Sequence, residues 1–229
     1  MRSSVCFAAG LLLAVALTAA AQTSTATSEG PAAASLAARS WEWGPFFQGG
    51  TGVSNRWGYT FTSGGVQLGK VITNEHLRGI FRGQFEYAGQ LMPYWQAFTP
   101  PPHLQKGTGL PEGGGTYTGV SITPILLRWD LHPGQRFAPW VQGGGGLIYT
   151  THKFPPDVLV PHGTPGGTSV WNFTPQFGAG FHYFVKPRRS IDFLASAVHI
   201  SSASLGDKNP GVNASVQFQI GYTFWTRGK

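Results

Sequence analysis

The clearest pattern in the chain is a run near its C-terminus in which apolar and polar residues alternate. Side chains two residues apart on a β-strand point to the same face, so residues 212–225 predict a strand with one apolar and one polar face. Such a strand fits the wall of a transmembrane β-barrel, with apolar side chains toward lipid and polar ones toward the lumen. The apolar set is Val216, Phe218, Ile220, Tyr222 and Phe224, and the polar set is Ser215, Gln217, Gln219 and Thr223.

Helical periodicity is weak along the whole chain, and Gly and Pro occupy the gaps between extended segments. We therefore predict an all-β fold, an eight-stranded antiparallel transmembrane β-barrel. The candidate strands lie near 43–53, 58–72, 78–90, 116–130, 136–152, 168–186, 189–203 and 212–225.

Short and long gaps between these segments alternate. The gaps TNEHL, LHPGQ and KPR are short, LMPYWQAFTPPPHLQKGTGLPEGGG and HKFPPDVLVPHGTPGG are long, SLGDKNPG is intermediate, and the short SNRWG is an exception. Outer-membrane barrels have short periplasmic turns and longer external loops. The pattern therefore predicts a bacterial outer membrane location, with both termini in the periplasm and the loop after the seventh strand outside the cell.

Composition agrees with a membrane barrel. Charged residues make up 11% of the chain, against about 25% in soluble proteins. After the first residues no apolar run reaches the roughly 18 residues of a transmembrane helix. The net charge is +7, or +6 without Arg2, and no basic run is interleaved with aromatics. This favours contact with anionic lipid head groups over nucleic acid.

The N-terminus, MRSSVCFAAGLLLAVALTAAAQ, has the features of a secretory signal with a cleavage site before Gln22. We predict a signal peptide at 1–21, a flexible leader at 22–40 and an outer-membrane β-barrel at 41–229. The single cysteine, Cys6, lies within the signal, which excludes disulfide scaffolds, cysteine zinc sites and cysteine nucleophiles from the mature chain. A soluble periplasmic barrel of lipocalin type is an alternative.

Several motifs do not indicate a cofactor or metal site. The segment Gly64–Lys70 resembles a phosphate-binding loop, but Val71 replaces the required Ser or Thr and the flanks are strand-like. The seven histidines show no i, i+4 pair and no cluster with carboxylates, so we expect neither a metal nor a cofactor. Tryptophans are expected at the membrane interfaces. These are Trp41, Trp43, Trp57, Trp95, Trp140, Trp171 and Trp225.

His199 and Ser201 are the candidate catalytic pair. Residues two apart on a strand share a face, with Cα atoms roughly 6.6 Å apart. An imidazole can reach a hydroxyl over that distance, so His199 could be the general base of a Ser201 nucleophile. Asp192 lies in the opposite phase, and a carboxylate is unfavourable on the lipid face. The pair is therefore expected on the outer wall, near the external end of the strand. By spacing alone, two ordinary strand residues remain the alternative.

The segment HISSASLGDKNPGVNASVQFQIGYTF resembles the C-terminal signature of the lipid A 3-O-deacylases, the PagL-type outer-membrane acyl-ester hydrolases. The resemblance is specific over this segment and otherwise rests on size, signal peptide and strand number. It implies a serine esterase in which Ser201 attacks the ester carbonyl and His199 accepts its proton. It also implies that Asn209 stabilises the oxyanion and that Asn213 stands where the family often has an acid orienting the histidine.

Two departures from the family pattern bear on activity. Ser202 replaces the asparagine that usually follows the nucleophile, and Asn213 is an amide rather than an acid. An amide can hold an imidazole but lacks the charge that stabilises imidazolium, and the acid-to-amide change lowers turnover by roughly 10⁴ in a Ser-His-Asp triad. Asp207 could substitute from the same loop.

The resemblance implies lipid A, within lipopolysaccharide, as the substrate, and the outer-membrane lipids as surroundings. It implies no cofactor and no nucleic acid, and a homodimer is compatible with it. The alternative function is a non-catalytic outer-membrane barrel that acts in adhesion or envelope structure through its long external loops.

Overall fold

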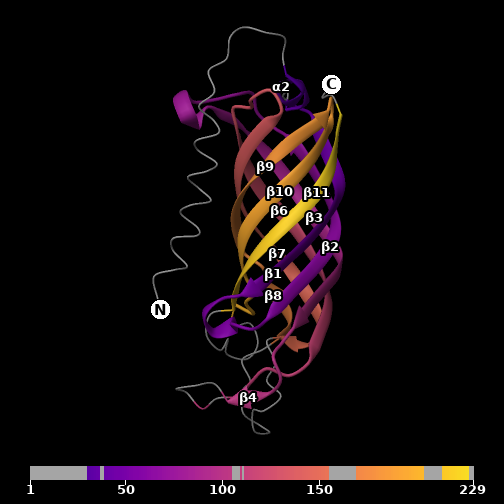
Figure 1. Cartoon of the computed structure of the whole chain (residues 1–229), viewed down its shortest axis with the longest axis vertical. Helices are drawn as coiled ribbons and strands as arrows, with labels where there is room; N and C mark the ends of the chain where they lie inside the picture. Colours follow the sequence, from indigo (N-terminus) through magenta and orange to yellow (C-terminus); the bar gives the residue numbers. More distant parts are fainter. Residues whose placement is uncertain are drawn as a thin grey trace.

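A computed structural model describes residues 30–36, 39–104, 109, 111–154, 169–203 and 213–226, and these form a closed antiparallel β-barrel (Figure 1). Neighbouring wall strands are hydrogen-bonded all the way round, and the pairing of β1 with β11 joins the two ends of the chain. Backbone groups in a bilayer have no water to bond, so a wall without free edges is required. No helix within these ranges is long and apolar enough to cross a membrane.

The wall contains eight strands, as predicted, if β8 and β9 are counted as one. Both β8 and β9 pair with β7, and the interruption between them falls at Thr174-Pro175, where proline has no N–H to donate. The wall strands are β1 (Trp41–Gly52), β2 (Thr60–Val71), β3 (Gly83–Phe98), β6 (Thr116–Leu131), β7 (Phe137–Phe154), β8 (Ser169–Phe173), β9 (Gln176–Lys186), β10 (Arg189–His199) and β11 (Ala214–Thr226). Outside the wall are α2 (Pro31–Ser35), η2 (Ser54–Arg56), η3 (Gly79–Phe81) and the small hairpin of β4 (His103–Leu104) and β5 (Pro111–Glu112).

The two ends of the barrel differ in their connections. We call the end that carries α2 the turn end, and the end that carries β4 the loop end (Figure 1). The connections 72–82, 132–136 and 187–188 lie at the turn end, and the strand ends that flank 53–59, 99–115, 155–168 and 200–213 lie at the loop end. Apart from 53–59, the connections at the loop end are longer than those at the turn end, which is the pattern expected when the turn end is periplasmic and the loop end external.

Two predicted segments differ in the structure. The third strand was expected at 78–90 but occupies Gly83–Phe98, because its register shifts between Met92 and Trp95 and the bulge hides the alternation. The flexible leader was expected at 22–40, but Pro31–Ser35 form α2. Alanine and proline give these residues a short helix, and its apolar side packs on the barrel.

A hydrophobic cluster closes the turn end. Ala32 and Leu36 are buried there, and the backbone N–H of Ala32 donates to the carbonyl of Gln135 at 3.3 Å. The cluster consists of Ala32, Leu36, Val71, Ala138, Phe184 and Trp225. Burial of these side chains explains why this part of the leader is fixed to the barrel.

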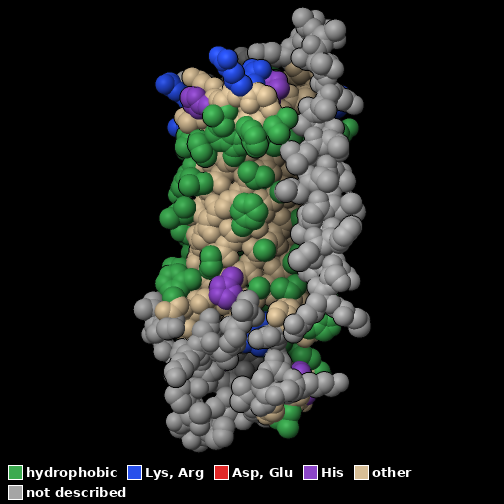
Figure 2. Space-filling view, turned by 90° about the vertical axis from the view of Figure 1, so that its left-hand side faces the viewer, with side chains coloured by type: hydrophobic (Ala, Val, Ile, Leu, Met, Phe, Trp, Pro, Cys, Tyr) green, Lys and Arg blue, Asp and Glu red, His purple; other side chains and the backbone are tan. Residues whose placement is uncertain are grey.

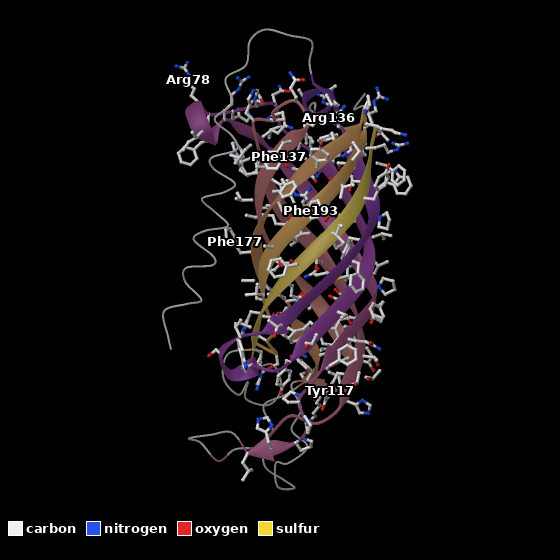
Figure 3. The ribbon with its side chains drawn as sticks, in the orientation of Figure 1. Arg78, Tyr117, Arg136, Phe137, Phe177 and Phe193 are labelled. Atoms are coloured by element: carbon white, nitrogen blue, oxygen red, sulfur yellow. The ribbon has the colours of Figure 1, made fainter. Side chains whose placement is uncertain are left out.

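The exterior carries a band of apolar side chains between the two ends (Figure 2). Figure 3 shows Phe177 and Phe193 along the wall, with Arg78 and Arg136 at the turn end and Tyr117 at the loop end. Along each strand, exposed apolar residues alternate with buried polar ones, for example exposed Phe218 and Ile220 with buried Gln217 and Gln219. The band is the surface expected to contact lipid chains.

The tryptophan prediction was correct for only part of its set. Trp41, Trp43, Trp57 and Trp171 are exposed, whereas Trp95, Trp140 and Trp225 are buried. The three buried rings lie in positions where the alternation directs them into the lumen. There they fill space instead of anchoring the barrel at an interface.

The lumen holds an ionic cluster centred on Arg128. Its Nη1 lies 3.0 Å from Oε1 of Glu42 and 3.0 Å from Oε1 of Glu86, and all three side chains are buried. The guanidinium also lies over the Trp140 ring, with Cζ 4.3 Å from its centroid. The cluster joins side chains from β1, β3, β6 and β7 inside the lumen.

We expect Arg128→Met to lower the free energy of unfolding by about 3–5 kcal/mol, because it leaves two buried carboxylates without their cation. The measurement is urea unfolding of the folded barrel in detergent micelles, followed by tryptophan fluorescence. The triple variant Glu42→Gln/Glu86→Gln/Arg128→Met removes all three charges and should recover most of the loss. Equal losses in the single and triple variants would assign the effect to packing instead of charge.

Candidate active site on the outer wall

The last residues of β10 alternate strictly between the two faces of the wall. Leu194, Ser196, Val198 and Ile200 are buried, whereas Phe193 and Ala197 are exposed and His199 is half-buried in the same phase. Ser201 continues the outward phase and is also half-buried. His199 and Ser201 therefore lie on the outer face, as predicted from the facing of Asp192.

The residue between the pair anchors the strand end. Ile200 is 2% exposed and belongs to the hydrophobic cluster that fills the lumen at the loop end. This cluster consists of Tyr59, Phe61, Trp95, Ala97, Tyr117, Ile148, Phe154 and Ile200. With Ile200 held inward, the side chains before and after it must point outward.

Backbone hydrogen bonds hold the pair from both sides. Ser201 forms a bridge with Phe173, in which Phe173 N donates to Ser201 O at 2.7 Å and Ser201 N donates to Phe173 O at 3.0 Å. His199 N donates to Pro175 O at 2.9 Å, and on the other side Ile200 N donates to Asn213 O at 2.9 Å. The pair therefore lies on a hydrogen-bonded part of the wall, with His199 as the last residue of β10 and Ser201 just beyond it.

The two catalytic candidates do not contact each other through a hydrogen bond in the described part of the chain. The Ser201 hydroxyl accepts a hydrogen bond from the Ala203 N–H at 3.1 Å. Catalytic hydrogen bonds are often long before substrate binds and tighten in the complex.

Asn213 lies on the other face of the wall. Its side chain is 4% exposed, in phase with the buried Ser215 and Gln217, and its Oδ1 accepts a hydrogen bond from Arg56 Nε. The residue paired with His199 on β11 is Ala214, which faces outward. The structure thus separates Asn213 from the His199 ring, since adjacent strand residues point to opposite faces.

Ser202, the residue after the candidate nucleophile, also lies on the inner face of the wall. Ser202 is 2% exposed, and its hydroxyl has no hydrogen-bond partner within the described residues. It therefore faces inward and does not share the outer site with Ser201. Asn209 and Asp207 belong to 204–212 and lie outside the described residues.

The outer surface around the pair is apolar and includes small side chains. Phe177 is 62% exposed and pairs with Ala197, one step along the strand from His199 toward the middle of the barrel. Toward the loop end, the Tyr149 and Trp171 rings contact each other with centroids 4.9 Å apart. Aromatic girdles mark the interfaces of membrane barrels. The pair therefore lies close to an aromatic cluster near the loop end of the wall.

A second group of ionisable residues was missed by the sequence analysis. His182 does cluster with carboxylates, because strand pairing brings Glu42, Glu86 and His182 to within 4.8 Å of one another through one ligand atom each. The Nη1 of Arg128 lies among them, 3.0 Å from both glutamates and 3.4 Å from His182 Nε2. The guanidinium occupies the position that a metal would take, so these residues are better suited to an internal ion pair.

We expect thiols placed at 199 and 201 to react with a small membrane-soluble thiol reagent much faster than a thiol at 200. His199→Cys, Ile200→Cys and Ser201→Cys are each made with Cys6→Ser, since Cys6 is the only native cysteine. Ala197→Cys, at an exposed position of the same face, is the fast-reacting control. Fast reaction at 200 with protection at 199 would mean that the strand is turned the other way.

Comparison with known proteins links the chain to one family. A family model described as lipid A 3-O-deacylase (PagL) matches residues 30–223. A search of curated protein sequences finds no significant match.

Solved structures of outer-membrane proteins are similar at low sequence identity. The outer-membrane enzyme PagL is 14% identical, with 78% of this chain and 98% of that chain covered and a TM-score of 0.44. The outer-membrane protein OprG from Pseudomonas aeruginosa is 13% identical, with 83% and 97% covered and a TM-score of 0.45. Ail of Yersinia pestis is 12% identical, with 82% and 99% covered and a TM-score of 0.41. The family match spans most of the chain, and this outer-membrane β-barrel belongs to the lipid A 3-O-deacylase (PagL) family.

Proposed function

We propose that the protein is a serine esterase that removes the ester-linked acyl chain at the 3-O position of lipid A. Ser201 is the nucleophile and His199 is its general base. The observation that carries the proposal is the position of the pair, on the outer face of the wall at the external end of the apolar band. A hydrolase that faces the membrane at this depth meets acyl esters of lipids and not soluble metabolites.

In the proposed reaction, the bonds are made and broken at Ser201, His199 and water. Ser201 Oγ attacks the ester carbonyl carbon while His199 takes the hydroxyl proton, giving a tetrahedral oxyanion. Collapse breaks the bond to the sugar oxygen, which leaves as a hydroxyl with the proton from His199, and the acyl group remains on Ser201. Water then attacks the acyl-enzyme with His199 again as base, releasing the fatty acid and restoring Ser201.

The surroundings of the pair support this substrate. Below Ser201, the outward residues Ala197 and Ala195 are small and lie between the larger Phe177 and Phe193. An acyl chain could lie along this part of the wall with its ester at Ser201 and its methyl end toward the middle of the bilayer. The sugar and phosphate groups of lipid A would then lie level with the external loops.

The oxyanion and the orientation of His199 require further groups. We propose Asn209 as an oxyanion donor, since a preorganised side-chain amide can stabilise the developing charge. We propose a structural role for Asn213, which fixes the start of β11 beside Ile200. Its hydrogen bond with Arg56 and its inward-facing side chain support this role. On this proposal the dyad acts without an amide at the His199 ring.

We expect Ser201→Ala and His199→Ala each to lower deacylation by about a thousandfold or more, because each removes a member of the reacting pair. Folded protein is reconstituted with lipopolysaccharide, and lipid A is examined by mass spectrometry for loss of one hydroxyacyl chain. Ser202→Ala is the matched control, since this neighbouring serine faces inward. No deacylation by the native chain, or unchanged deacylation by Ser201→Ala, would contradict the proposal.

Asn213→Asp separates the two roles of Asn213. If the side chain stays with Arg56, the new carboxylate pairs with that guanidinium, and turnover should change by less than about tenfold. If instead it reaches His199, the added charge should raise turnover steeply, toward the roughly 10⁴-fold gap between amide and acid in a triad. The measurement is the initial rate of acyl release at equal amounts of folded protein, with Asn213→Ser as the uncharged comparison.

A further inference from the structure

At the turn end, a row of aromatic and basic side chains crosses four adjacent strands on the outer face. Trp43 of β1 pairs with Phe224 of β11, Phe224 pairs with Arg189 of β10, and Arg189 pairs with Lys186 of β9. Directly paired residues of an antiparallel sheet project from the same face. These four side chains, with Arg188 in the turn, line a cleft of about 660 Å³.

The aromatic rings in this row hold one of the cations, Arg189, in place. The Trp43 and Phe224 rings are stacked with centroids 4.5 Å apart, and Arg189 Cζ lies 4.5 Å from the centroid of Phe224. The Arg189 Nη1 also donates to the carbonyl of Arg188 at 2.9 Å. Stacking on one face leaves the remaining guanidinium N–H groups directed away from the ring and available to an acceptor.

These cations have no carboxylate partner among the described residues. Four of the acidic side chains that the structure describes, Glu42, Glu86, Asp130 and Asp192, are buried in the lumen. The fifth, Glu75, lies in a turn, where it pairs with Arg82 at 2.5 Å and His132 at 2.5 Å. Burial alone would raise the pKa of Glu75, but hydrogen bonds from His132 and Arg82 outweigh it and lower the pKa, so Glu75 is ionised and already occupied.

The row lies at the edge of the apolar band. On the same face, four residues further along each strand toward the middle of the barrel, lie Phe47, Ile220 and Phe193, each at least 40% exposed. Beyond the row lies the tight turn at 187–188. Figure 2 shows Lys and Arg side chains gathered past the hydrophobic band at this end. An unpaired cation at this boundary is level with the head groups of the periplasmic leaflet.

We propose that Trp43, Phe224, Lys186, Arg188 and Arg189 form a binding site for the phosphate head group of an anionic phospholipid in the periplasmic leaflet. The phosphate accepts hydrogen bonds from Arg189 and Arg188 and lies near the ammonium of Lys186. The aromatic pair packs against the glycerol and the first methylenes of the acyl chains. This site is at the opposite end of the barrel from Ser201 and is independent of the proposed esterase activity.

The experiment compares lipid contact at Trp43. The full folded chain is placed in phosphatidylcholine vesicles that contain a minor fraction of brominated phosphatidylglycerol or brominated phosphatidylcholine, which quench nearby tryptophans. The signal lost in Trp43→Phe isolates the contribution of Trp43. We expect Trp43 fluorescence to be quenched far more by the brominated phosphatidylglycerol than by the brominated phosphatidylcholine. This preference for phosphatidylglycerol should fall by about 25-fold in Lys186→Gln/Arg189→Gln, at roughly fivefold for each cation.

The matched control is Arg39→Gln/Arg78→Gln, which removes two exposed cations at the same end but outside the row. It should keep the native preference, and both double variants must first show the heat-dependent electrophoretic shift of a folded barrel. Equal quenching by the two lipids in the native chain would overturn the proposal. An equal fall of the preference in the control variant would also overturn it, because it would mean general charge attraction. Loss of the preference on adding millimolar inorganic phosphate would overturn it as well, because it would mean a site for free phosphate.

Discussion

The structure depends on one constraint: in a closed wall surrounded by lipid, every backbone polar group must be paired and every side chain must face either lipid or lumen. Paired strands satisfy the hydrogen bonds of the backbone. They also make successive side chains alternate between lipid and lumen, with a period of two residues. The residues follow this period closely, with Gln217 and Gln219 inside and Phe218 and Ile220 outside. The ionic cluster around Arg128 and the hydrophobic clusters at the two ends occupy much of the space inside the wall.

The same constraint builds the candidate site. Ile200 is drawn into the loop-end cluster, and its two neighbours, His199 and Ser201, are consequently presented to lipid. Asn213 and Ser202 fall in the inward phase, which separates them from the pair although they are close in sequence or register. On the proposed function, the membrane helps to orient the acyl substrate, because His199 and Ser201 lie on the outer face of the wall. This is why depth along the strand matters as much as the chemistry of the residues.

Sequence reasoning predicted the features that follow from period two and from loop length. The eight strands, the two unlike ends and the outward facing of His199 and Ser201 were all available from alternation and from the position of Asp192. The extension of β3 to Phe98 was not, because a bulge near Pro93 interrupts the pattern. The packing of α2 on the barrel and the contact of His182 with Glu42 and Glu86 were also not predicted. Both depend on which segments distant in sequence are neighbours in the fold. Trp95, Trp140 and Trp225 face inward because of their position in the alternation along each strand. Residue type alone does not reveal this position.

The central claim is that a nucleophilic hydroxyl and its base are exposed together to the lipid side of the wall. The most direct measurement is covalent trapping of the folded barrel with a long-chain alkyl fluorophosphonate, followed by peptide mass spectrometry. The Ser201 oxygen should displace fluoride and carry the phosphonyl group, and the adduct should form far more slowly when His199 is replaced by alanine. An unmodified Ser201 under conditions that label a known serine esterase, or labelling that does not depend on His199, would contradict the account.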